Sequence, residues 1–135
     1  MTMVIDASVA IKWVCEEADS DRALALLTGE PLVAPSLWLV EAANALWRRR
    51  RLGELTRSQI EARLEALKDA PVRSIETERL LESSLRLADD LEHPIYDCLY
   101  LATAIELDTH VITADKRFEK AVSRRSALKR RLRLL

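Results

Sequence analysis

The sequence predicts an α/β protein in which helices cover both faces of a parallel sheet. Short apolar runs of the kind that form buried strands alternate with longer segments whose apolar residues recur at helical spacing. Strands buried on both faces read as continuous apolar runs, and this alternation is typical of parallel sheets. At 135 residues the chain is long enough for one domain with a core and too short for two ordinary ones. We therefore expect a single domain over residues 1–135.

The first half of the chain is expected to open with a strand at residues 3–6, where an apolar run ends in an acid. Ser20, Ser36 and Thr56 are expected helix N-caps, because a hydroxyl can accept a hydrogen bond from a free backbone N–H group. Gly29 is expected to end one of these helices. The elements after the first strand are then helices at 7–17 and 20–29, a strand at 31–35, and helices at 37–51 and 57–70.

The second half alternates in the same way. Pro71 breaks the chain before a short strand at 72–75, and residues 110–115 repeat the pattern of the opening strand. Two helices are expected between these strands, at 76–92 and 93–107, and the second is so apolar that it should pack centrally. At the C-terminus, Leu132 and Leu134 fall on one side of a possible edge strand, although a basic helix fits residues 128–135 nearly as well.

The composition excludes several classes of protein. With 49% hydrophobic and 32% charged residues, 2 Gly and 4 Pro, the chain is neither collagen-like nor low in complexity nor largely disordered. No apolar run approaches the ~20 residues that span a bilayer, and no basic segment precedes the short apolar stretch at the N-terminus. We expect a cytoplasmic protein without a membrane segment. Cys15 and Cys98 lack metal-finger spacing and are expected to be buried and free.

The formal net charge of −1 hides an uneven distribution. Residues 116–135 contain nine Lys or Arg and one acid, Glu119, and a second basic cluster spans Arg48 to Arg51. Such clusters are either solvated helix ends or surfaces that bind nucleic acid. Charge alone leaves both interpretations open.

Four acids are expected at one edge of the sheet. Asp6 and Asp115 each follow an apolar strand, and ligands of open parallel sheets bind beyond the carboxyl ends of the strands. Glu41, inside the apolar run "LWLVEAANALW", and Asp97, on the apolar helix at 93–107, can point toward the same edge. Four crowded carboxylates repel one another, and Mg²⁺ or Mn²⁺, which prefer oxygen ligands, would relieve that repulsion. No His/Cys set indicates zinc.

Each of these acids also has a purely structural interpretation. Asp6 or Ser8 could cap the first helix, and Asp115 could cap a helix that begins at Lys116. Asp97 could complement the dipole of its helix. Glu41 and Asn44, three residues apart on one helix face, could form a polar pair in the core. The predicted position of all four acids at one edge favours the metal site.

Four segments together resemble the PIN-domain nucleases, and in particular the VapC toxins of toxin–antitoxin pairs. These segments are "VIDASVAIKW", "VEAANALWRR", "YDCLYLATA" and "VITADKRF", and the resemblance extends from Met3 to about Phe118. It implies a three-layer α/β/α sandwich with a central parallel sheet, usually in a homodimer. It places the metal-binding and catalytic acids of the family on Asp6, Glu41, Asp97 and Asp115. The polar residues that orient them fall on Ser8, Asn44 and Thr113.

The resemblance implies a metal-dependent endoribonuclease that is the toxin of a type II toxin–antitoxin system. Mg²⁺ or Mn²⁺ would be the cofactor, tRNA or rRNA the expected substrate, and a small antitoxin the inhibitory partner. The phosphate backbone needs cations outside the acidic site, and Lys12 lies near enough to contribute. The candidate RNA-binding residues are Arg48, Arg49, Arg50, Arg51, Lys116 and Arg117.

Other classes of protein remain possible from the residues. A receiver module or a haloacid-dehalogenase-type phosphatase also gathers acids and Mg²⁺ at this edge, but Asp6 is followed by Ala7 and Ser8 where each would need a further acid. A PIN-like scaffold that binds nucleic acid without cleaving it would usually have lost an acid, and none is missing. An apolar groove for the antitoxin could include Trp13, Leu24, Leu27 and Trp38, although ordinary core is the favoured interpretation of these residues.

Overall fold

A computed structural model describes residues 1–135 and contains one sheet of five parallel strands. The spatial order is β3-β2-β1-β4-β5, and at the centre Val4 of β1 pairs with Val33 of β2 and Val111 of β4. The strands are β1 (Met3–Ile5), β2 (Leu32–Pro35), β3 (Val72–Ile75), β4 (Val111–Thr113) and β5 (Leu132–Leu134). The predicted parallel sheet is confirmed, and the C-terminal segment forms the edge strand rather than a basic helix.

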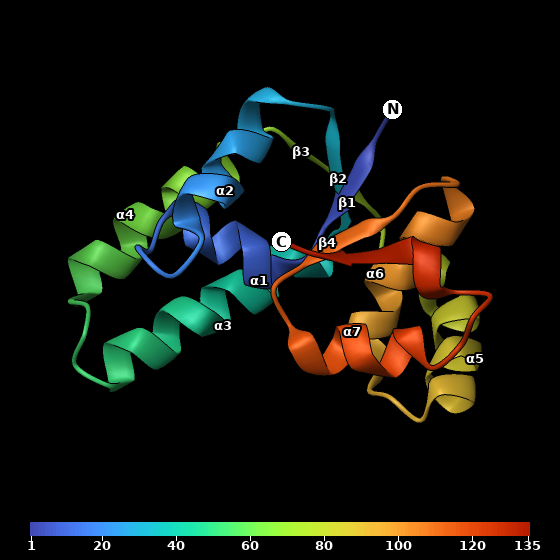
Figure 1. The fold of residues 1–135 in the computed structure, drawn as a ribbon. Coiled ribbons are helices and arrows are strands. Elements are labelled where there is room, and N and C mark those ends of the chain that lie inside the picture. The colour runs from blue at the N-terminus through green and yellow to red at the C-terminus, as the bar shows by residue number, and fades with distance from the viewer.

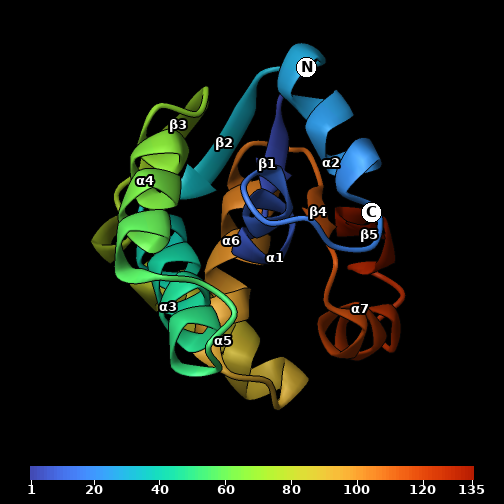
Figure 2. The same cartoon turned by 90° about the vertical axis from the view of Figure 1, so that its left-hand side faces the viewer.

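Helices cover both faces of the sheet (Figure 1). One layer holds α1 (Ala7–Ala10), α2 (Ser20–Ala25), α3 (Leu37–Arg51) and α4 (Arg57–Lys68). The other holds α5 (Leu81–Leu91), α6 (Ile95–Glu106) and α7 (Lys116–Ser123). Figure 2, turned by 90°, shows α3 and α4 on the left and the strands following from β3 on the left to β5 on the right. This is the expected three-layer α/β/α sandwich. No helix is both long enough and apolar enough to cross a membrane.

The order of the strands creates a crevice between β1 and β4. The chain proceeds from β1 outward to β2 and β3, and then returns past both to place β4 on the other side of β1. The connections on the two sides therefore run in opposite directions. Such a switch point leaves the carboxyl ends of the two central strands open to a ligand. Asp6 and Asp115 lie at those two ends, after Ile5 and Thr113.

The core lies on both faces of the sheet, and α6 is its most completely buried helix. Every residue of α6 from Cys98 to Ala104 is buried, and the helix contacts β1, β2 and β4, as its apolar sequence predicts. Cys15 and Cys98 are buried and free, which confirms that prediction. Trp13 and Trp38 pack edge to face with ring centroids 6.5 Å apart, and Trp38 is buried in the core. The core interpretation is therefore correct for Trp38, whereas Trp13 is only partly buried where it packs against the core.

Two predicted N-cap hydrogen bonds are not formed. Ser20 is the first residue of α2 rather than its cap, because Asp19 occupies the cap position with a left-handed backbone (φ 66°). The Ser20 hydroxyl accepts from the Glu17 N–H and donates to the Cys15 carbonyl instead. Ser36 stands at the cap position of α3, but its hydroxyl bonds to Thr77. Ser20 therefore bonds to the preceding loop, and Ser36 makes a long-range contact in place of its cap.

Other boundaries follow local chemistry more closely. Thr56 caps α4 in a capping box with Gln59, as its hydroxyl predicts. Gly29 ends the short 3₁₀ turn Leu26–Thr28 that continues α2. The helix expected at 7–17 ends early, because α1 passes into a 3₁₀ turn, Ile11–Trp13, and the next residues form a loop. That loop carries Glu17 back toward Lys12.

Candidate active site

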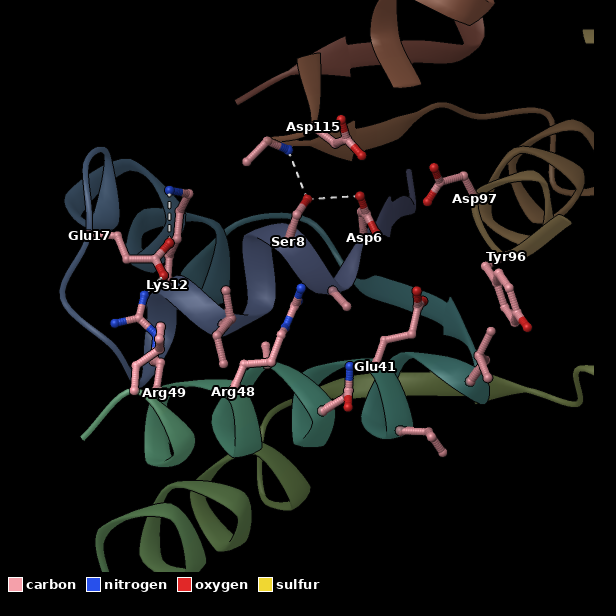
Figure 3. A pocket seen from close by; sticks show the side chains of 18 of the residues that line it. Asp6, Ser8, Lys12, Glu17, Glu41, Arg48, Arg49, Tyr96, Asp97 and Asp115 are labelled. Carbon is pink, nitrogen blue, oxygen red and sulfur yellow. Dashed lines mark hydrogen bonds and ion pairs between the residues drawn. The ribbon is translucent and has the colours of Figure 1, made fainter. Parts of the chain in front are cut away.

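A cavity of about 880 Å³ opens at the carboxyl ends of β1 and β4. All four predicted acids line it, although they come from a strand end, two helices and a helix cap (Figure 3). Ser8 and Asn44, two of the three predicted orienting residues, line it as well. The structure thus brings together Asp6, Glu41, Asp97 and Asp115, which are up to 109 positions apart in the chain.

Asp6 is the most buried of the four acids, with 4% of its surface exposed. Its carboxylate accepts hydrogen bonds from the Ser8 hydroxyl at 2.8 Å and the Thr113 hydroxyl at 2.6 Å. It makes no side-chain capping bond to α1, so capping does not explain it. Burial raises the pKa of Asp6 to about 6, and the charges of Asp97 and Asp115 act in the same direction, although the two hydroxyls oppose the rise.

Ser8 and Thr113 join the two central strand ends. Besides binding Asp6, the Ser8 oxygen accepts from the Ala114 N–H at 2.9 Å, and the Thr113 oxygen accepts from the Asp115 N–H at 3.1 Å. These bonds tie the start of α1 to the turn after β4. Both residues therefore fix the direction in which the carboxylate of Asp6 points.

Glu41 projects from the middle of α3 toward Asp6 (Figure 3). The buried Tyr100 hydroxyl donates a hydrogen bond of 2.5 Å to its carboxylate. Burial raises the pKa of Glu41 to about 7; the Tyr100 hydrogen bond opposes this, and the charges of Asp6 and Asp97 add to it. No hydrogen bond joins Glu41 to Asn44, so the two do not form the polar core pair.

Asp97 lies in the first turn of α6, and His93 holds it in place. The His93 Nε2 atom is 2.6 Å from a carboxylate oxygen of Asp97, and the imidazole stacks on the ring of Phe118 with centroids 5.4 Å apart. Burial raises the pKa of Asp97; His93 opposes the rise and Asp115 contributes to it. The position suits the helix dipole, but the contacts show an oriented carboxylate at the cavity wall.

Asp115 does cap α7, as its structural interpretation predicts. Its Oδ1 accepts from the backbone N–H groups of Arg117 at 2.9 Å and Phe118 at 3.3 Å. Capping occupies only this oxygen, and the residue also lines the cavity. The cap and the site are therefore compatible, since the capping bonds fix the carboxylate at the rim.

The opposite end of the same cavity has a different chemistry. Glu17 accepts from Lys12 at 3.2 Å and also pairs with Arg49, which reaches Glu54 at 3.4 Å. Figure 3 shows Lys12, Glu17 and Arg49 beyond Arg48, away from the four acids. We call Lys12, Glu17, Arg49 and Glu54 the ion-pair cluster. Lys12 and Arg49 are held by protein partners, while Arg48 lines the cavity without an ion pair.

The other predicted RNA-binding residues are dispersed. Arg50 and Arg51 line neither this cavity nor the one beside it, and the Arg51 guanidinium lies over the Trp47 ring, 5.7 Å from its centroid. Lys116 also lies outside both cavities. Arg117 lines the neighbouring cavity, which shares Asp97 and Asp115 with the first.

The donor set fits a hard divalent cation. Every candidate ligand supplies carboxylate oxygen, and no Lys or Arg forms an ion pair with any of the four acids. The side chains as they stand do not form a closed cluster, because no three His, Cys, Asp or Glu groups converge tightly enough to hold a metal ion. The raised pKa values of Asp6, Glu41 and Asp97 reflect burial together with this uncompensated negative charge.

Two orienting residues were not predicted from the sequence. His93 precedes Asp97 by four positions, a spacing that can bring two side chains together on a helix, so a local signal existed. Tyr100 and Glu41 are 59 positions apart, and only the packing of α6 near α3 brings them together. No sequence pattern indicates that contact.

The fold and the site define a doubly wound α/β protein with an all-carboxylate cavity at its switch point. Residues 3–123 match the PIN domain family. Ribonuclease VapC3 of Mycobacterium tuberculosis is 30% identical over 120 residues, which cover 88% of this chain and 86% of the relative. The chain therefore belongs to the PIN-domain family, within its VapC-type ribonuclease group.

Solved structures share the same fold. PAE2754 from Pyrobaculum aerophilum superposes with a TM-score of 0.71 at 23% identity and covers 90% of this chain and 84% of its own. VapC20 of Mycobacterium tuberculosis, a Sarcin-Ricin loop cleaving toxin, superposes with a TM-score of 0.66 at 19% identity. The match covers 88% of this chain and 94% of VapC20. A chain of VapBC2 from Rickettsia felis, solved with a promoter DNA fragment, superposes with a TM-score of 0.65 at 12% identity. The match covers 99% of this chain and 98% of the VapBC2 chain. These likenesses confirm the predicted fold.

Proposed function

We propose that this protein is a metal-dependent endoribonuclease and the toxin of a type II toxin–antitoxin system. The observation that carries the proposal is the set of four carboxylates that line one cavity at the switch point without a Lys or Arg partner. Keeping such charges together and buried is unfavourable unless a cation binds them. Membership of the VapC-type group supports RNA as the substrate.

Asp6, Asp97 and Asp115 would hold Mg²⁺ or Mn²⁺, with Glu41 completing the cluster. When bound, the metal would lower the pKa of a coordinated water and neutralise charge on the scissile phosphate. The protein contributes orientation, because Ser8 and Thr113 fix Asp6. His93 and Tyr100 fix Asp97 and Glu41 in the same way, each through one short hydrogen bond.

Glu41 completes the carboxylate set from α3. Burial and the neighbouring acids raise its pKa to about 7 without metal, so a bound cation would favour its charged form. Asn44, one turn further along α3, lines the same cavity and offers an amide to the substrate or to water. We assign Glu41 to the metal-binding set and Asn44 a supporting role.

The partners follow from the same group of proteins. We infer a small cognate antitoxin, supported by the likeness to a chain of VapBC2, and a cytoplasmic homodimer of one-domain chains. We expect the RNA target to be tRNA or rRNA; VapC20 is described as cleaving the Sarcin-Ricin loop. Binding of RNA without cleavage is the alternative, and the presence of all four acids argues against it.

Cleavage of cellular RNA by the purified protein tests the proposal. New RNA ends, mapped by sequencing, should appear with Mn²⁺ and disappear with EDTA or in the Asp97→Asn variant. Asp21→Asn makes the same chemical change at an exposed carboxylate of α2 and should cleave like the wild type. Equal cleavage by Asp97→Asn would refute the site assignment, and folded, partner-free protein that yields no new ends would favour the binding scaffold.

A further inference from the structure

A second cavity, of about 540 Å³, adjoins the four acids on the side of α7. It shares Asp97 and Asp115 with the first cavity, so the two cavities adjoin at the acid site. Three cations also line it, namely Arg117, Lys120 and Arg124. We call these three residues the α7 cations. An anionic strand that crosses the acids can therefore continue directly over them.

The α7 cations share one face of their helix. Their spacing of three and then four residues places the side chains in a row along the helix axis. Phe118 and Val122 lie on the buried side of the same helix, whereas all three cations are exposed. The row is fixed in direction because Asp115 caps the start of α7 and Phe118 is stacked against His93.

The α7 cations have no partners within the protein. None of them forms an ion pair, and none donates a side-chain hydrogen bond. The neighbouring basic residues behave differently, because Arg125 donates to the Asp90 carbonyl and Arg131 pairs with Asp108 at 2.9 Å. Lys116, Lys129, Arg130 and Arg133 also form no ion pair, but they lie outside both cavities, so the α7 cations are the unpaired C-terminal cations beside the acid site.

We propose that the α7 cations form a subsite for the phosphodiester backbone of single-stranded RNA, next to the position of cleavage. This inference rests on the proposed function and adds the direction of the strand. The helix rises about 10 Å from Arg117 to Arg124, a span that reaches more than one phosphate of a strand. The cations also offset the repulsion that Asp97 and Asp115 exert on the approaching backbone.

The same geometry favours RNA over an acidic protein segment. The cavity of the α7 cations adjoins the carboxylate site at Asp97 and Asp115, and a phosphodiester is the group that would react there. An acidic polypeptide would also satisfy the cations, but it offers no phosphodiester to the adjoining acids. The position of the cations beside that site therefore favours RNA.

Binding in EDTA tests the subsite separately from cleavage. Fluorescence anisotropy with labelled oligouridylate and oligoadenylate should be measured over a range of salt concentrations. We expect the triple variant Arg117→Gln/Lys120→Gln/Arg124→Gln to bind both oligonucleotides at least tenfold more weakly. The slope of log affinity against log salt should fall in magnitude by about 2, since each lost phosphate contact in a single strand contributes about 0.7. Lys120→Arg should keep wild-type affinity.

A charge-matched triple variant supplies the control. Arg57→Gln/Lys68→Gln/Arg73→Gln also removes two arginines and one lysine, all exposed and outside both cavities, and should bind RNA within twofold of wild type. Equal losses in the two triples would overturn the subsite, because net charge alone would explain them. Binding of poly-L-glutamate in place of either RNA would also overturn it.

Adding Mn²⁺ separates this inference from the proposed function. If the wild type cleaves RNA and the α7 triple variant has a raised KM with an unchanged kcat, both the subsite and the proposed nuclease are supported. Cleavage with the same KM in both triples rejects the subsite and leaves the nuclease. If RNA binding depends on the α7 cations but the wild type does not cleave RNA, the subsite proposal stands and the nuclease proposal is rejected.

Discussion

Carboxylates lie at both ends of the main cavity, but only those at one end have Lys or Arg partners. In the ion-pair cluster, Glu17 lies between Lys12 and Arg49, so its charge is neutralised by the protein. At the other end, Asp6 and Glu41 receive only hydroxyl hydrogen bonds, and their pKa values rise to about 6 and about 7. A buried carboxylate with a cation partner completes the fold, whereas one without a partner leaves the fold in need of a ligand.

Position in the sheet explains why the ends differ. The four acids converge at the switch point, where strand β1 and strand β4 leave a crevice that no helix fills. The ion-pair cluster instead joins the loop after α1 to the C-terminal half of α3. We therefore predict that the four acids govern activity and that the ion-pair cluster contributes modestly to stability.

Removing one unpaired acid should have the largest effect. Asp6→Asn keeps the size of the side chain but removes the charge that would bind the metal. We expect cleavage to fall by more than about 100-fold, beyond the 10- to 100-fold typical of residues that only orient a metal ligand. Mn²⁺ should also stabilise this variant less than the wild type in thermal unfolding. Retention of metal-dependent cleavage would place the reaction elsewhere in the cavity.

The free energy of unfolding without metal should fall as the pH rises from about 4 to about 7. The pKa of Asp6 is higher in the folded protein, about 6, than its ordinary 3.8, so folding favours the protonated form. That contribution is complete below about pH 4 and is lost as the pH passes the folded value. For Asp6 alone the difference amounts to about 3 kcal/mol, and Glu41 acts in the same direction.

Urea unfolding at a series of pH values checks this, with Mn²⁺ as the second variable. Saturating Mn²⁺ should restore stability at pH 8, because the cation replaces the missing protein partner. The Asp6→Asn variant should show a shallower pH dependence than the wild type. Stability that increases through this pH range in EDTA would show that the acids are compensated in a way the contacts do not reveal.

Tyr100→Phe should reduce cleavage by about tenfold, at the lower end of the range for orienting residues. The change removes only the hydroxyl that donates to Glu41 at 2.5 Å, and the pKa of Glu41 should rise further because that hydrogen bond lowers it. The pH at which cleavage reaches half its maximum should therefore move upward. Tyr96→Phe is the matched control, since Tyr96 lines the cavity with an exposed side chain and should leave the profile unchanged.

The same contrast explains how much the sequence could predict. Asp6 and Asp115 were predictable because a strand end fixes their position, and α6 because its apolar residues demand burial. Glu41 was conspicuous in an apolar helix, but its partner Tyr100 comes from a distant segment. The arginine run gave no sign that Arg49 would pair with Glu17 while Arg48 stayed free, because that depends on how the loop after α1 folds back.

The smallest effect is expected at the ion-pair cluster. Glu17→Gln removes the charge between Lys12 and Arg49, but Lys12 keeps its hydrogen bond to the Ala18 carbonyl at 2.8 Å and Arg49 keeps Glu54. Partly exposed pairs contribute about 1 kcal/mol or less, so urea unfolding should show a loss of that size. Cleavage should stay within twofold, because no member of the cluster contacts the four acids. A loss of cleavage comparable to that of Asp6→Asn would mean that the two ends of the cavity act as one site.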